Sequence, residues 1–155
     1  MRAFAAAGGE SFRIDSGDVA RGVDIVAQAL AWADVRLSAK PVLFYSTAEP
    51  GDVKAVQQQI GVQRAGEMIE QTLAAVARGV VERGVRQLVI AGGETAGACV
   101  QALQIEQLRI GPQIDPGVPW CHAQTSLAPG GLHLALKSGN FGADDFFTKA
   151  FSLLR

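Results

Sequence analysis

Apolar and polar positions along the chain form blocks that predict strands separated by helices. Apolar residues recur at helical spacing over about 19–38 and again over 62–81, and short apolar runs at 42–46 and 87–91 are typical of buried strands. Further strands are expected at 12–15, 108–110, 118–122 and 132–136, and further helices at 96–103 and 143–154. The segments 111–119 and 124–131 carry Gly and Pro and predict loops.

The alternation of strands with helices predicts the fold class. We expect an α/β fold with a mostly parallel sheet, flanking helices and some antiparallel pairing in the C-terminal part. Hydrophobic residues make up 48% of the 155 positions and charged residues 19%, which is a globular rather than a disordered composition. The length predicts a single domain over residues 1–155.

Charge and hydropathy narrow the classes of partner. A formal net charge of −1 gives no electrostatic basis for binding nucleic acid or an anionic membrane. The sequence has no uninterrupted apolar run near the ~18 residues of a membrane span, so we expect a cytoplasmic protein with no membrane partner. Cys99 and Cys121 are expected to be buried free thiols, because two isolated cysteines form no disulfide framework or zinc spacing.

The first candidate site is the glycine pair that ends the apolar run at 87–91. Gly92 and Gly93 stop the strand, Glu94 and Thr95 follow, and a helix is predicted directly after them. Such a turn directs backbone N–H groups and the positive end of a helix dipole at an anion. Thr95 is a candidate to cap the helix or to donate to a phosphate oxygen. Glu94 would repel a phosphate, so it is a candidate to cap the helix, hold a magnesium-bound water or accept from ribose hydroxyls.

The second candidate site follows the apolar run at 132–136. It comprises Lys137, Ser138, Gly139, Asn140, Phe141 and Gly142. The lysine side chain can neutralise phosphate charge, and the glycines let the backbone approach a ligand closely. The competing interpretations are a solvated strand end for the lysine and simple turn chemistry for both glycine segments.

Neither segment matches a common nucleotide motif. No lysine follows the first loop as a Walker A loop requires, and the dinucleotide fingerprint of a dehydrogenase is missing. His122 and His133 have no partner at a triad or metal-ligand spacing and are expected to be structural.

Three ordered segments carry a family resemblance. Residues 91–97, 109–120 and 136–147 together resemble the C-terminal nucleotide-binding domain of the four-carbon acid sugar kinase family, nearest to its 3-oxo-tetronate kinase branch. The resemblance implies binding of ATP with Mg²⁺ and phosphorylation of 3-oxo-tetronate, erythronate, threonate or similar acids. It implies nucleotide contacts from both glycine segments, from Gly92 through Thr95 and from Lys137 through Gly142.

The chain also departs from the family pattern. Family members are longer, and their N-terminal domain, which binds the sugar acid and would supply the catalytic residues, is absent here. A Gly-Ser loop on the first strand of the nucleotide domain is missing, and Ala96 stands where the family often has Ser. We therefore expect a truncated domain that is inactive as a kinase by itself and that can self-associate through its exposed domain interface. The alternative is a non-catalytic interaction or scaffold fragment with no nucleotide affinity.

Overall fold

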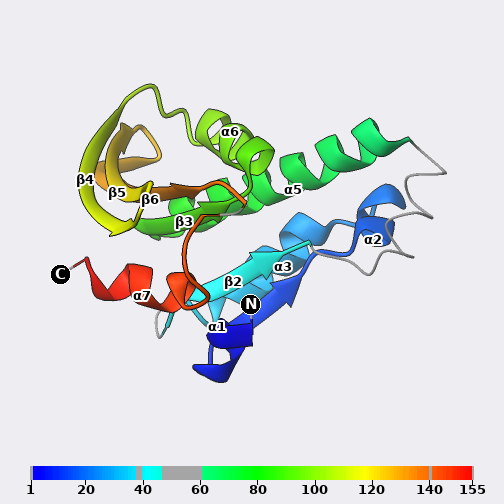
Figure 1. The fold of residues 1–155 in the computed structure, drawn as a ribbon. Coiled ribbons are helices and arrows are strands. Elements are labelled where there is room, and N and C mark those ends of the chain that lie inside the picture. Colours follow the sequence, from blue (N-terminus) through cyan, green and yellow to red (C-terminus); the bar gives the residue numbers. More distant parts are fainter. Residues whose placement is uncertain (1, 38–39, 47–60, 140, 155) are drawn as a thin grey trace.

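A computed structural model of the chain describes residues 2–37, 40–46, 61–139 and 141–154 (Figure 1). Its helices are α1 (Arg2–Ala6), α2 (Ser16–Ala20), α3 (Ile25–Asp34), α5 (Val62–Glu82), α6 (Gly93–Ala102) and α7 (Phe146–Ser152). Its strands are β1 (Glu10–Arg13), β2 (Val42–Tyr45), β3 (Gln87–Ala91), β4 (Leu108–Asp115), β5 (Val118–Thr125) and β6 (Ala128–Lys137). The predicted α/β class is confirmed.

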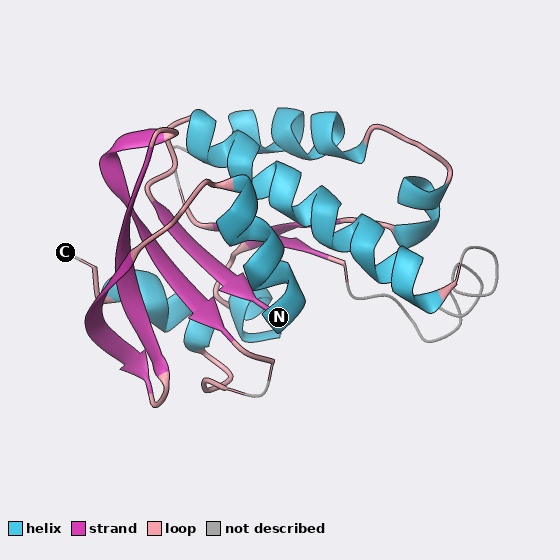
Figure 2. Ribbon diagram, turned by 90° about the horizontal axis from the view of Figure 1, so that it is seen from above, coloured by secondary structure: helices cyan, strands magenta, loops and turns pink. Residues whose placement is uncertain are grey.

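The described strands form two sheets. Strands β1 and β2 pair in parallel, and a four-stranded sheet has the order β3-β6-β5-β4. Within the larger sheet β3 and β6 are parallel, whereas β6, β5 and β4 pair antiparallel. Antiparallel pairing therefore lies in the C-terminal part, as expected. Figure 2 shows the long, twisted strands of this sheet gathered toward one end of the molecule.

The hairpin between β4 and β5 replaces the loop predicted at 111–119. Strand β4 continues to Asp115, turns at Pro116 and Gly117, and returns as β5. Gly117 has φ +79°, a backbone conformation that glycine adopts without strain. The register is shifted between Ile110 and Asp115, where Gly111 and Pro112 lie, and β4 is an edge strand, a position in a sheet that tolerates proline. Pairing across the hairpin thus overrides the local loop signal.

Two predicted elements match the structure closely, and a third is divided in two. The long helix predicted at 62–81 is confirmed as α5, and the strand at 87–91 coincides with β3. The single helix predicted at 19–38 is wrong, because Gly22, at φ +75°, separates α2 from α3. The side chain of Asp24 then caps α3 by accepting a hydrogen bond from the Ala27 N–H at 2.9 Å.

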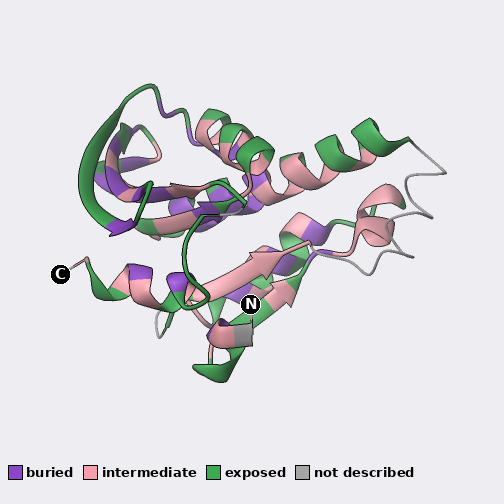
Figure 3. Ribbon diagram, in the orientation of Figure 1, coloured by how far each residue is buried: buried purple, intermediate pink, exposed green. Residues whose placement is uncertain are grey.

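The buried residues form three clusters around α5 and the larger sheet (Figure 3). One side of α5 places Val76 and Val80 against α3, and another places Ala77 and Val81 against α6 and β6. The third cluster centres on Trp120, which is 1% exposed and lies between the sheet and α7. Helix α5 therefore connects the two sheets.

Two sequence expectations concern polarity. Cys99 and Cys121 are buried and free, as predicted. Among the described ranges, no helix is both long and apolar enough to cross a membrane.

Candidate functional site

The two glycine segments begin side by side. Ala91 at the end of β3 is in register with Lys137 at the end of β6, and the Gly92 N–H donates to the Lys137 carbonyl at 2.9 Å. Because β3 and β6 are parallel, both segments leave the same edge of the sheet (Figure 1). Ligands of α/β proteins bind at such carboxyl edges.

The first glycine segment leads directly into α6. Gly92 occupies the N-cap position with φ +110°, a conformation that would strain any residue with a side chain, whereas a side chain added at Gly93 would meet open space. Helix α6 begins at Gly93, three residues before the predicted start at 96. Thr95 and Glu94 therefore lie inside its first turn and do not cap it, and α6 has no side-chain cap in the described structure. Its first backbone N–H groups are available to an anion.

A cavity of about 800 Å³ opens beside this helix start. The N-terminal half of α5 forms one wall, and Glu94, Thr95, Ser16 and Ser46 line the rest. The Ser16 hydroxyl is buried and has no hydrogen-bond partner among the described residues. Sequence reasoning missed both serines. Their signal is positional, since each is among the first polar residues after the carboxyl end of a strand, β1 or β2.

Two carboxyl groups meet in the same cavity. Burial raises the pKa of Glu70, and the negative charge of Glu94 raises it further, as does a hydrogen bond that protonated Glu70 donates to the Glu94 carboxylate. A carboxyl pair in this arrangement shares a proton or binds a cation. Glu70 lies on α5, and nothing in its local sequence distinguishes it from other charged residues of that helix. No group of three or more metal-binding side chains occurs in the described part of the chain.

The second glycine segment is closed by its own lysine. Lys137 Nζ donates to the carbonyl of Gly139 at 2.9 Å and to that of Ser138 at 3.3 Å. Phe141 is 50% exposed, and Gly142 has φ +86° with Lys137 and Phe146 packed around its α-carbon. Asn140 lies outside the described residues. The ammonium group is thus directed at the loop carbonyls, next to the edge where the first segment begins.

The turn between β4 and β5 contacts the second glycine segment and the residue that follows it. The Asp115 carboxylate, 8% exposed, accepts from the Ala143 N–H at 3.0 Å and forms an ion pair with Lys149 of α7. The hydrogen bond from Lys149, followed by that from Ala143, holds the pKa of Asp115 below its usual range. Gly117 lies against the Phe141 ring, and a β-carbon added at Gly117 would be 3.0 Å from an atom of that ring. Asp115 lies in the segment 111–119 that the sequence predicts as a loop, and the structure places it at the end of β4 with these partners.

Comparison with known proteins covers almost the whole chain. Residues 2–147 match the family described as the nucleotide-binding C-terminal domain. A 3-oxo-tetronate kinase of Burkholderia multivorans is 58% identical over 144 residues, which are 93% of this chain and 33% of that protein. A 3-oxo-tetronate kinase of Cupriavidus necator is 52% identical over 95% of this chain and 33% of its own length. The chain spans about a third of the length of these curated relatives.

Solved structures agree on the fold. A crystal structure of a Haemophilus influenzae protein matches with a TM-score of 0.85 and 33% identity, covering 99% of this chain and 37% of that one. A Bordetella bronchiseptica protein, crystallised as a domain-swapped dimer with bound citrate, matches with a TM-score of 0.68 and 22% identity over 96% of this chain and 35% of its own.

Proposed function

The chain belongs to the family of nucleotide-binding C-terminal domains, and we propose that its two glycine segments hold the phosphates of ATP or ADP. The observation that carries this proposal is the Gly92–Lys137 hydrogen bond, which joins the two segments at one sheet edge. Uncapped N–H groups at the start of α6 would donate to phosphate oxygens. Lys137 would exchange its loop carbonyls for a phosphate and so neutralise part of the charge.

We propose Mg²⁺ as the ion that accompanies the nucleotide. Mg²⁺ is usually bound by one or two carboxylates together with substrate phosphates, and Glu70 and Glu94 supply such a pair beside the helix start. When bound, the ion would neutralise charge on the transferred phosphoryl group. This role resolves the conflict between the Glu94 carboxylate and a phosphate, because the cation would lie between them.

The wider function follows from the relatives. They are 3-oxo-tetronate kinases about three times as long as this chain. We propose that this chain is the nucleotide-binding part of an ATP-dependent kinase for four-carbon sugar acids, with 3-oxo-tetronate first and erythronate or threonate as other candidates. The base that activates the sugar hydroxyl would come from a sugar-acid-binding domain. The chain alone would not catalyse transfer, because both substrates must be held on one scaffold.

Calorimetric titration with ADP tests nucleotide binding. We expect saturable binding that is stronger with Mg²⁺, and little binding of adenosine, which has no phosphates. Glu94→Gln and Glu70→Gln should reduce the gain from Mg²⁺ while preserving binding of ADP without the ion. Glu82→Gln, on the same helix as Glu70 but in an exposed pair with Arg78, is the matched control. Absence of heat from folded protein at high-micromolar concentration would contradict the proposal.

A kinase assay tests the second half of the proposal. The pure chain, supplied with ATP, Mg²⁺ and each four-carbon acid, should show no turnover. A rate within the usual kinase range of roughly 1–100 per second would contradict the assignment of the catalytic base to another domain.

A further inference from the structure

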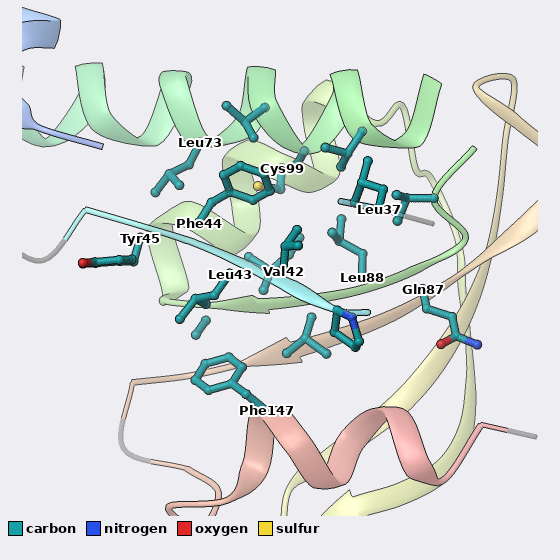
Figure 4. A pocket seen from close by; sticks show the side chains of 18 of the residues that line it. Leu37, Val42, Leu43, Phe44, Tyr45, Leu73, Gln87, Leu88, Cys99 and Phe147 are labelled. Atoms are coloured by element: carbon teal, nitrogen blue, oxygen red, sulfur yellow. The ribbon is translucent and has the colours of Figure 1, made fainter. Parts of the chain in front are cut away.

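A second cavity, of about 700 Å³, separates the two sheets (Figure 4). Strand β2 forms one side and β3 the other, and Figure 4 shows Leu43 of β2 and Leu88 of β3 among the side chains that line the cavity. Most of its lining is apolar. This space is distinct from the cavity that holds Glu70 and Glu94, although Thr95 lines both.

Both strands present a free hydrogen-bonding edge to this cavity. Within the described structure β2 pairs only with β1, and β3 pairs only with β6. The Tyr45 carbonyl accepts a hydrogen bond from the N–H of Ile14, the residue that follows β1. The Arg86 carbonyl accepts one from the N–H of His133 in β6. Because bonding directions alternate along a parallel strand, the backbone groups of Phe44 and Val89 face the opposite way, into the cavity. An edge of this kind is a template for another strand.

Helices cover the cavity on both faces. Helix α5 lies on one face, where Leu73 points inward, and α7 lies on the other, where Phe147 points inward (Figure 4). A strand placed between β2 and β3 would therefore be buried on both of its faces. Strands in that position consist of continuous apolar residues, without alternation of polar and apolar positions.

The strands on both sides of the cavity favour one direction for such a strand. Figure 4 shows β2 and β3 running the same way, with Val42 and Gln87 toward one end and Tyr45 toward the other. Strand β1 is parallel to β2 and β6 is parallel to β3. An added strand parallel to both would join the two sheets into one of seven strands in the order β1-β2-added strand-β3-β6-β5-β4, which lies within the usual size of a sheet.

We propose that this cavity, which we call the strand gap, binds one parallel, continuously apolar β-strand from the part of the polypeptide that the relatives carry outside the matched third. The matched family is a C-terminal domain, so in the relatives that remainder precedes the matched region. Phe4 of α1 lines the strand gap, which places the N-terminal helix beside it. A second copy is a poorer occupant, because each strand described here is already paired and would have to leave its own ladder.

Amide hydrogen exchange on a fused chain tests the proposal. A run of Val, Ile and Leu as long as the five-residue β3, flanked by lysines, is joined to the N-terminus by a flexible Gly/Ser linker. The linker gives the fused run an effective concentration of about millimolar, so even a weakly binding strand would occupy the strand gap and be detected. We expect exchange at the Phe44 and Val89 amides to slow at least about tenfold, while the Leu88 amide, already bonded to β6, changes little.

Matched controls distinguish pairing in the strand gap from nonspecific adhesion of an apolar segment. A fused run that alternates Val and Thr should not protect the Phe44 and Val89 amides, and neither should a run with Lys at its centre. Both controls change only the fused run and leave the sequence of the protein itself unchanged. Leu43→Lys should abolish protection, whereas Val35→Lys, at a position 76% exposed, should preserve it.

Three outcomes would overturn the proposal: no protection at Phe44 and Val89, equal protection by the alternating run, or protection in the unfused chain that rises with protein concentration. The last would identify a second copy as the occupant. None of these measurements uses nucleotide, so their outcome does not depend on whether the proposed nucleotide site is correct.

Discussion

The Asp115 carboxylate accepts a hydrogen bond from the Ala143 backbone N–H at 3.0 Å, across 28 positions of sequence. Its other oxygen pairs with Lys149 of α7. One buried carboxylate therefore fixes the end of the second glycine segment to the β4–β5 turn and to the helix that follows. This contact makes the geometry of the segment depend on a residue that need not touch a ligand.

Asp115→Ala should weaken ADP binding and lower the melting temperature. Removing the carboxylate leaves the Ala143 N–H and the Lys149 ammonium without this partner, so Ala143 and α7 lose their link to the β4–β5 turn. We expect the melting temperature to fall by about 2–8 °C, measured by circular dichroism. Asp144→Ala removes an exposed carboxylate from the same loop and should change neither quantity. Equal effects from the two variants would contradict the anchoring role of Asp115.

Acid should remove the stabilisation that Asp115 provides. Its pKa is lowered in the folded state, chiefly by the hydrogen bond from Lys149, so the folded protein binds fewer protons there than the unfolded chain. The stabilisation is complete above the ordinary value of about 3.9 and is lost as pH falls through the lowered pKa. The difference in melting temperature between the native chain and Asp115→Asn should thus be constant from about pH 5 to 8 and shrink below about pH 4. A difference that grows in acid would contradict this assignment.

Gly93→Val should abolish ADP binding without disturbing the fold. A side chain at Gly93 meets open space and needs no unusual φ, so the protein tolerates it, yet it projects at the start of α6 where we place the phosphates. Gly97→Val adds the same side chain one turn further along the helix, also into open space, and is the matched control. Calorimetry with ADP should separate the two variants, with both circular dichroism spectra near native. If Gly93→Val binds ADP normally, the first glycine segment is only a turn and does not hold the phosphates.

Lys137→Ala should weaken ADP far more than adenosine. A charge-assisted hydrogen bond to phosphate is worth roughly 1.5–3 kcal/mol, which corresponds to an affinity loss of about 10- to 100-fold. Arg109→Ala, which removes an exposed cation from β4, is the control. An equal loss for ADP and adenosine would show that the lysine acts by holding the Ser138 and Gly139 carbonyls. No loss for either would leave the phosphates to backbone N–H groups alone.

Cys99 should resist alkylation. Burial raises the pKa of its thiol to about 11, so the reactive thiolate is scarce at neutral pH. In a Cys121→Ala background, iodoacetamide at pH 8 should modify the folded chain at least about two orders of magnitude more slowly than the unfolded chain. Mass spectrometry in buffer and in denaturant gives the two rates, and similar rates would contradict the burial of Cys99.

Local sequence determined the strand–turn–helix units of this protein. The apolar run before Gly92 and the periodic residues of α5 predicted their elements closely, because strand and helix periods are properties of neighbouring positions. The family resemblance also came from ordered local segments, and it is confirmed by the match over residues 2–147. Both glycine segments were recognised this way, while their contacts with nucleotide stay a prediction.

Only the tertiary structure decided which distant residues meet. Strand pairing extended β4 through a segment whose glycine and prolines predict a loop, and it brought Asp115 to Ala143. Packing of α5 beside α6 brought Glu70 to Glu94, although no local pattern marks Glu70. The strand gap arises in the same way, because the free edges of β2 and β3 face one another only once both sheets have packed on α5. Such contacts depend on chain topology, which the period of side chains along a single element does not encode.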